Sequence, residues 1–200
     1  MITYLETNEN DIDEIELLYR KHLDNGTALR ARLERVCRDP ETLSLKAVDS
    51  ETGKIVGVIM YTPGISFSCS YPRIVKKVEN LAGNIPVYTG EAIFVEDEYR
   101  NRHIARNFEI KIREKIANIA KAKGTNIYVL HEMWVYPNGK TPAYGLVSTV
   151  FNICHDFGVI PRFYRDYFKN ESLCPICGEN CVCSARITIS EIGSETDPVN

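Results

Sequence analysis

The residues from Gly90 to Lys123, GEAIFVEDEYRNRHIARNFEIKIREKIANIAKAK, decide the fold of this 200-residue chain. The apolar run that ends at Val95 is bounded by turn residues, as a buried strand is. The stretch after it repeats apolar residues three or four positions apart, which places them on one side of a long helix. These residues are Ile104, Phe108, Ile112, Ile116 and Ile119. A short polar turn, Glu96 to His103, joins the strand to the helix.

This polar turn is a candidate anion site. A helix start leaves backbone N–H groups without partners and carries the positive end of the helix dipole, so phosphate oxygens bind there. The segment from Arg100 to Lys123 holds eight Lys or Arg against two Glu, which makes it +6 within a chain of net charge −3. A local excess of this size predicts a phosphorylated partner.

The turn and its flanks resemble a known signature. Val95, Tyr99-Arg100 and His103-Ile104-Ala105 look like the acyl-CoA-binding motif of the GNAT N-acetyltransferase superfamily, Arg/Gln-x-x-Gly-x-Gly/Ala after a strand ending in Val. This sequence departs from the motif in two places. Asp97 stands where proline is common, and His103 stands at the first glycine, where a Cβ restricts the backbone.

The resemblance implies an α/β (α+β) fold, with a GNAT-like mixed, mostly antiparallel central sheet of about six to seven strands flanked by helices. It also implies acetyl-CoA as co-substrate and a primary amine as acceptor. The end of the strand would hold the pantetheine arm, and the turn would hold the pyrophosphate. The cofactor-binding residues implied in this way are Phe94, Val95, Arg100, Asn101, Arg102, His103, Ile104 and Ala105.

Length and composition predict one domain over residues 1–200, with a cysteine-rich insertion at 174–183. A hydrophobic content of 44% can bury a substantial core. No stretch approaches the ~20 apolar residues of a membrane helix, and the start lacks the features of a signal peptide. We therefore expect a soluble, cytoplasmic protein, either a monomer or a homodimer.

The order of the predicted elements is a second point of resemblance to GNAT proteins. We expect strands at 1–7, 43–49, 54–62, 90–95, 126–131 and 184–191, and helices at 12–22, 27–38, 72–83, 104–123 and from 141 to about 157. The excursion from Gly64 to Pro86 either shapes the acceptor pocket or lies on the surface. The loop expected from Glu132 to Lys140 holds the only tryptophan, Trp134, which either lines that pocket or packs in the core.

The reaction that the resemblance implies needs groups that move protons. An attacking amine must lose a proton, and the departing CoA thiolate must gain one. We choose Glu91 as the base because it shares strand parity with Val95, with His131 and Glu132 as competitors and a water relay as a further route. In Pro161 to Phe168 the family's closing Tyr-x-x-x-Gly-Phe pattern is partly matched. Tyr164 is the candidate acid, although Phe163 occupies the strictly spaced position.

A second signal is the run Cys174-Pro-Ile-Cys177-Gly-Glu-Asn-Cys181-Val-Cys183. Four thiols in ten residues suit a structural Zn²⁺ site, and Cys-Pro-x-Cys-Gly resembles a zinc knuckle. Because the second pair is cramped, Cys154 or His155 can complete a site made from two of these thiols. Iron–sulfur ligation and a redox dithiol are the alternatives.

Three function classes are compatible with these residues. The first is an acetyl-CoA-dependent N-acetyltransferase, and the second is a non-catalytic sensor of a CoA-type ligand on the same fold. The third is a zinc-knuckle protein that binds a protein or a nucleic acid. We rank nucleic acid last, because no Lys or Arg lies between Asn170 and Ser184 to contact phosphates.

Overall fold

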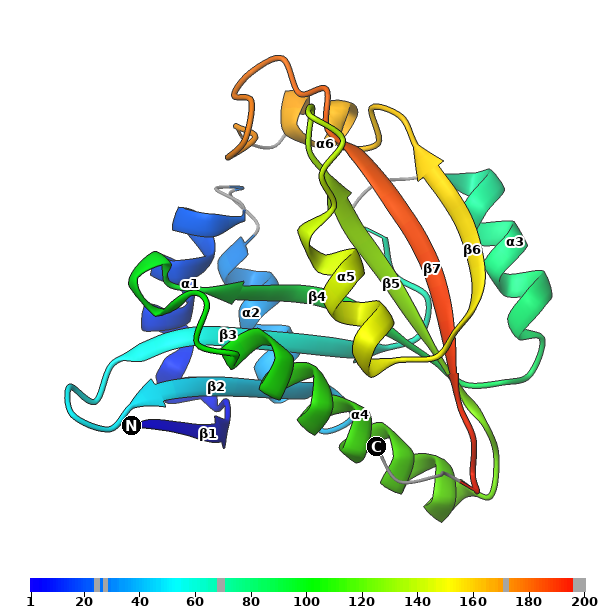
Figure 1. Ribbon diagram of the computed structural model, residues 1–200, viewed down its shortest axis with the longest axis horizontal. Helices are drawn as coiled ribbons and strands as arrows, with labels where there is room; N and C mark the ends of the chain where they lie inside the picture. Colours follow the sequence, from blue (N-terminus) through cyan, green and yellow to red (C-terminus); the bar gives the residue numbers. More distant parts are fainter. Residues whose placement is uncertain (24–25, 27–28, 68–70, 171–172, 196–200) are drawn as a thin grey trace.

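The computed structural model describes residues 1–23, 26, 29–67, 71–170 and 173–195, and it shows a twisted sheet with helices on both faces (Figure 1). The strands are β1 (Ile2–Glu6), β2 (Leu43–Asp49), β3 (Ile55–Pro63), β4 (Val87–Val95), β5 (Ile127–Val135), β6 (Ile153–Ile160) and β7 (Ser184–Ile192). The helices are α1 (Ile12–His22), α2 (Leu29–Arg38), α3 (Pro72–Ala82), α4 (Ile104–Lys123), α5 (Pro142–Val150) and α6 (Arg165–Asn170). The helix start expected at Thr27 lies outside the described residues.

The sheet has seven strands in the order β1-β2-β3-β4-β5-β7-β6. Its neighbouring strands are antiparallel except for β4 and β5, which run parallel. This confirms the predicted mixed, mostly antiparallel sheet. β4 and β5 pair from Val87 and Tyr128 to Gly90 and His131 and then diverge, which opens the sheet between their carboxyl ends (Figure 1).

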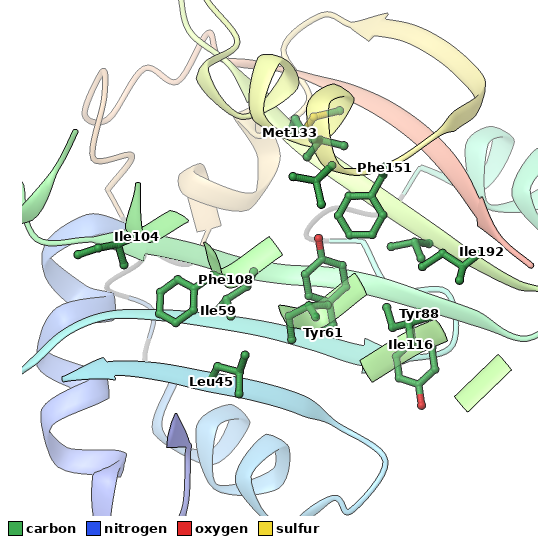
Figure 2. Close-up of a cluster of buried hydrophobic side chains, with 14 of the residues drawn as sticks. Leu45, Ile59, Tyr61, Tyr88, Ile104, Phe108, Ile116, Met133, Phe151 and Ile192 are labelled. Carbon is green, nitrogen blue, oxygen red and sulfur yellow. The ribbon is translucent and has the colours of Figure 1, made fainter. Parts of the chain in front are cut away.

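Helix α4 packs its apolar stripe on one face of the sheet, as the sequence predicts. Ile104, Phe108, Ile112 and Ile116 are at most 2% exposed, and they pack with residues of β2 and β3 such as Leu45 and Ile59 (Figure 2). Ile119 is partly buried, and Ala120 takes the fully buried position in the last turn. Gly124 adopts a left-handed conformation and ends the helix.

The opposite face of the sheet carries two further groups of elements. Helices α1 and α2 cover β3 and β4 there, and α3, α6 and the cysteine segment cover β5 and β7. The excursion from Gly64 to Pro86 therefore contributes a packing helix, since Ile74 and Val78 of α3 are buried. In the parts of the chain that the structure describes, no helix combines the length and apolarity needed to cross a bilayer.

Two predicted elements are wrong. β5 continues to Val135, so the first four residues of the expected loop are strand, where they pair with β7. The helix from Pro142 ends at Val150, and Ile153–Ile160 forms β6 instead of continuing it. The apolar spacing in this stretch also suits a helix, but pairing with β7 makes it extended.

Candidate active site

A cavity of about 920 Å³ follows the opening between β4 and β5. Its lining comes from both strands, from the turn before α4, from the first residues of α4, and from the segment around α6. Every predicted cofactor-binding residue except Arg102 is part of that lining, and so are the three predicted catalytic residues, Glu91, His131 and Tyr164. The structure therefore brings residues that are far apart in sequence to one site.

The turn before α4 has the backbone geometry of an anion site. The first intrahelical bond runs from the Asn107 N–H to the His103 carbonyl at 3.0 Å, so the amides of Ile104, Ala105 and Arg106 have no helical carbonyl to donate to. Asn101 and His103 both have positive φ, at 61° and 59°. His103 thus adopts, at a cost of about 1 kcal/mol, the left-handed conformation that glycine favours.

Side chains around the turn fix its path. The Tyr99 hydroxyl donates to Asp49 at 2.6 Å, and this hydrogen bond lowers the pKa of that carboxyl. The Arg102 guanidinium lies over the Tyr99 ring, 4.9 Å from its centroid. Arg100 pairs with Asp97 at 2.7 Å and donates to the Val95 carbonyl at 3.4 Å. The turn is therefore held in place by contacts of this chain alone.

Only part of the positive charge between Arg100 and Lys123 lies at the cavity. Of the eight cations between Arg100 and Lys123, all within the described residues, Arg100 and Arg106 line the cavity. Others serve the fold: Lys115 pairs with Glu6, Lys123 lies 4.0 Å from Glu41, and Lys111 lies over the Tyr4 ring. The net charge of the segment therefore overstates the positive charge near a bound phosphate.

The left-handed backbone at His103 gives a first prediction. We expect His103→Val to be less stable than His103→Gly by about 1–2 kcal/mol, because a β-branched residue is strained at positive φ. Chemical denaturation measures the difference. Arg102→Val, at a neighbouring residue without positive φ, is the control and should cost less. Equal stability of the valine and glycine variants would contradict the observed backbone conformation.

A chain of buried polar side chains lies where β4 and β5 separate. The Tyr61 hydroxyl is 2.9 Å from Glu109 Oε2 and 3.4 Å from His131 Nδ1, and His131 Nε2 is 3.2 Å from Ser190 Oγ. Tyr61 points from β3 toward Phe151, whose ring is 4.8 Å from that of His131 (Figure 2). All four polar residues are buried, and the first three line the cavity.

Burial shifts the proton affinities of this chain. Desolvation raises the pKa of Glu109 from 4.5 to about 7, against a smaller lowering by the Tyr61 hydrogen bond. Desolvation also lowers the pKa of His131 to about 3, so its imidazole is neutral at pH 7. With Glu109 ionised, Ser190 donates to His131, His131 to Tyr61, and Tyr61 to Glu109. The donors then all point toward one carboxylate, as a proton relay requires.

Glu109 is the site residue that the sequence analysis misses. It is 2% exposed on α4, within the stripe that also holds Ala105, Ile112 and Ile116. A carboxylate at an apolar position of a helix is a signal, because buried charges are rare unless paired or functional. A net-charge count of the segment treats Glu109 like any other charged residue and does not reveal this signal.

Glu91 lies at the cavity, although the alternation used to place it is broken. Tyr61 of β3 pairs with Gly90, and Met60 pairs with Ala92, so Glu91 is the extra residue of a β-bulge. Its carboxylate accepts a hydrogen bond from Thr62 Oγ1 at 2.9 Å. Strand parity with Val95 is therefore wrong as a reason to choose Glu91, and its catalytic role stays a prediction.

Tyr164, rather than Phe163, lines the cavity. Tyr164 directly precedes α6 and packs against Trp134, with ring centroids 5.0 Å apart. Phe163 points elsewhere and stacks on Tyr71 at 5.0 Å. Trp134 also stacks on Phe168, so it both packs in the core and lines the cavity. Packing against the buried cluster is therefore confirmed for this tryptophan, and its part in an acceptor pocket stays a prediction.

The four cysteines of the segment before β7 converge. Their sulfur atoms all lie within 4.8 Å of one another, with Cys177 3.5 Å from Cys174 and 3.7 Å from Cys183, and Cys174 4.0 Å from Cys183. A tetrahedral ion with bonds of about 2.3 Å separates its sulfur ligands by about 3.8 Å. Reciprocal backbone bonds between Cys174 and Gly178 form the turn of the predicted knuckle. The cluster fits one metal ion.

The alternative ligands expected from the sequence lie elsewhere. Cys154 is exposed on β6, and its thiol donates to the Ile189 carbonyl. The cluster of potential ligands found in the described residues is made of the four segment cysteines, without Cys154 or His155. The prediction that Cys154 or His155 completes the site is therefore wrong. The closely spaced pair Cys181 and Cys183 does reach the other two thiols.

Known structures share this architecture. Arabidopsis thaliana NAA60 in complex with a bisubstrate analogue aligns with a TM-score of 0.67 at 15% identity, covering 98% of this chain and 100% of that one. The ribosomal-protein-S18-alanine N-acetyltransferase of Escherichia coli aligns with a TM-score of 0.60 at 11% identity, over 100% and 99%. The NatC complex bound to Gag peptide and CoA aligns with a TM-score of 0.57 at 19% identity, over 94% and 97%.

These similarities establish the fold of the chain. It is the fold of the GNAT N-acetyltransferases, as the signature around Arg100 predicts. No protein-family model and no curated protein sequence matches the chain.

Proposed function

We propose that the protein transfers the acetyl group of acetyl-CoA to a primary amine by direct attack. The observation that carries this proposal is that one cavity joins the unbonded amides at the start of α4 to the buried polar chain of Tyr61, His131 and Glu109, at the point where β4 and β5 separate. Acetyl-CoA needs the first feature for its diphosphate, and an amine needs the second for its proton. The complexes of NAA60 with acetyl-CoA and of NatC with CoA, which share the fold, support the choice of co-substrate.

The cofactor would lie along the end of β4 and the turn that follows. Beyond Gly90 the backbone groups of β4 that face β5 have lost their strand partner, so they are available to the amide groups of a pantetheine arm. Phe94 and Val95 line this part of the cavity. The amides of Ile104, Ala105 and Arg106, with the guanidinium of Arg106 beside them, would hold the diphosphate.

The chemical step would use groups at the apex of the opening. The amine nitrogen bonds to the acetyl carbon, an unpaired β4 amide stabilises the oxyanion, and collapse breaks the carbon–sulfur bond. The amine proton passes through a water molecule and the Tyr61 hydroxyl to Glu109. His131, whose two ring nitrogens are held by Tyr61 and Ser190, orients that hydroxyl. Tyr164 gives its hydroxyl proton to the leaving thiolate. Glu91 is a second candidate base, because it also lines the cavity.

The carboxylates that line the cavity favour an amine acceptor with a positive charge. Glu91, Glu109 and Glu132 all line the cavity, whereas its cationic lining residues lie in the cofactor turn and on α2 and α4. An amine that arrives as an ammonium ion is attracted to such a group of acids. Because the similar Escherichia coli enzyme is named for an alanine of ribosomal protein S18 and the NatC complex holds a peptide, a polypeptide N-terminus is the first acceptor to test.

We also propose that the four cysteines hold one structural Zn²⁺. Four thiolates complete a tetrahedron and leave no open position for a substrate, so the ion would fold the segment and take no part in the transfer. Its presence is measured by elemental analysis of the purified protein. About one zinc per chain supports the proposal, and a folded chain without metal contradicts it.

A non-catalytic sensor of a CoA-type ligand is the second candidate. It is favoured by His103, which places a side chain where the family signature has its first glycine. Calorimetry with acetyl-CoA and CoA, followed by a thiol-release assay with a panel of peptides, amino acids and polyamines, separates the two functions. Binding with thiol release supports the transferase. Binding without release on any amine supports the sensor, and absence of binding contradicts both.

The position of the diphosphate gives a second prediction. Arg106→Glu should weaken acetyl-CoA binding about tenfold, because it replaces a cation beside the helix start with an anion. Arg113→Glu, the same charge change on the same helix away from the cavity lining, should leave the affinity within about twofold. Isothermal titration calorimetry measures both. Equal effects of the two substitutions would place the phosphates elsewhere.

A further inference from the structure

The cysteine turn forms part of the cavity wall. Ile176 lies between the ligand positions Cys174 and Cys177, and it lines the cavity although its side chain is 42% exposed. An exposed isoleucine in the lining of this cavity provides an apolar contact for whatever enters. The same turn therefore contributes both to the thiol cluster and to the substrate cavity.

A continuous packed unit connects the thiols to the cavity. Cys174, Cys181 and Cys183 are buried in the same hydrophobic cluster as Tyr164 and Phe168. Trp134 packs against this cluster, with its ring 5.8 Å from that of Phe168 and nearly parallel to it. Tyr164, Phe168, Trp134 and Ile176 all line the cavity. A movement of the thiols is thus transmitted to the wall through side chains in contact.

Few backbone hydrogen bonds hold the cysteine turn in one conformation. The described residues between α6 and β7 contain no helix or paired strand beyond the two backbone bonds that join Cys174 and Gly178. A short segment of this kind stays in one conformation when a metal ion crosslinks it. We therefore expect Ile176 to keep its place only while the four sulfur atoms share an ion.

The cofactor end of the cavity belongs to a different part of the core. Ile104 and Ala105, at the anion site, pack in the cluster that α4 forms with β2 and β3. The contacts that fix the preceding turn come from Asp49 and Asp97. None of these residues is in the cluster that contains the thiols. The two ends of the cavity therefore depend on separate sets of contacts.

We infer that the metal-bound cysteine turn is a wall of the acceptor site, so that metal loading governs binding of the amine acceptor and leaves acetyl-CoA binding unchanged. The inference rests on the proposed acetyl transfer and adds a specificity-determining contact, Ile176, together with a dependence on zinc. The acceptor that fits has an apolar group as well as its amine, because Ile176 adds an apolar surface to the cavity that the carboxylates also line.

The test compares one protein with and without its metal. Zinc is removed from the full chain with a reversible thiol reagent and a chelator, and is then restored with zinc chloride. Removal should lower kcat/KM for the best amine of the panel at least about tenfold and shift the emission of Trp134 to the red. The affinity for acetyl-CoA should stay within about twofold, and zinc should restore transfer.

A matched pair of substitutions tests the contact of Ile176 with the acceptor without removing the metal. Ile176 lies between the first two cysteines. Val182 lies between the last two and is similarly exposed, at 46% against 42%, but it is outside the cavity lining. Ile176→Ala should raise KM for the acceptor about fivefold with zinc content and acetyl-CoA affinity unchanged, whereas Val182→Ala should change none of them.

Two outcomes would overturn the inference. One is transfer by metal-free protein at an unchanged kcat/KM, and the other is an Ile176→Ala variant that behaves like Val182→Ala. If both occur while acetyl-CoA still binds and reacts, this inference alone fails. Absence of acetyl-CoA binding by the metal-loaded protein would instead contradict the proposed function on which it rests.

Discussion

Replacement of Glu109 by glutamine is expected to stabilise the protein and to slow acetyl transfer. Burial raises the pKa of this carboxyl to about 7, so at pH 8 the folded protein holds a desolvated charge that the unfolded chain holds in water. Glutamine has the same shape and no charge, and its carbonyl can still accept from Tyr61. It cannot accept the proton at the end of the relay.

The size and pH dependence of the gain in stability follow from the pKa shift. Below pH 4.5 Glu109 is protonated in both states and costs nothing. As the pH rises toward 7, the unfolded chain releases the proton while the folded protein retains it, which favours unfolding. Above pH 7 the full penalty applies, and Glu109→Gln should raise the free energy of unfolding by about 3 kcal/mol.

The same substitution should lower the activity, although it raises the stability. With Glu109 as the final proton acceptor, kcat/KM should rise with pH through an apparent pKa near 7. The variant should transfer acetyl groups about a hundredfold more slowly and lose this pH dependence. Glu114→Gln, an exposed carboxylate on the same helix, is the control and should change neither quantity. A Glu109→Gln variant with full activity and an unchanged pH profile would exclude the relay.

Replacement of Cys183 by serine is the second large effect that we expect. Cys183 is fully buried, and its sulfur lies 3.7 Å from Cys177 and 4.0 Å from Cys174. Loss of one thiolate from a closed tetrahedral site releases the ion and leaves the other thiols in an apolar cluster. We expect the free energy of unfolding to fall by about 4 kcal/mol, with loss of zinc.

Cys154→Ser provides the control for this substitution. Cys154 is exposed and lies outside the cluster, so its removal should leave zinc content and melting temperature nearly unchanged. Cys183→Ser should lower the melting temperature by about 10 °C in a calorimetric scan. A Cys183→Ser protein that keeps its zinc and its melting temperature would contradict tetrathiolate binding.

The sequence predicts the fold well where the local pattern and the final packing agree. The stripe from Ile104 to Ile116 is helical by spacing, is buried as expected, and begins at the turn that carries the family signature. The order of strands and helices up to α4 is likewise correct, because each element has one consistent period. Four cysteines in ten residues predict a metal cluster, and their sulfur atoms do converge.

Prediction fails where contacts that are distant in sequence decide the structure. Ile153–Ile160 is a strand because β7 pairs with it, and the bulge at Glu91 depends on the register with β3. The proton affinity of Glu109 depends on residues brought together from β3 and β5, so counting charges along the chain cannot reveal it. The proposed base, acid and metal roles are therefore best tested as members of one three-dimensional site.

The place of β7 in the sheet has a consequence for synthesis on the ribosome. Ser184–Ile192 lies between β5 and β6, although both of those strands precede it in the chain. Until β7 has been synthesised, β5 and β6 expose backbone N–H and C=O groups without a strand partner. Strands of other chains can then pair with these edges. Closure of this half of the sheet must await translation of its final strand, and stalling before Ser184 is expected to yield an aggregation-prone chain that needs chaperones.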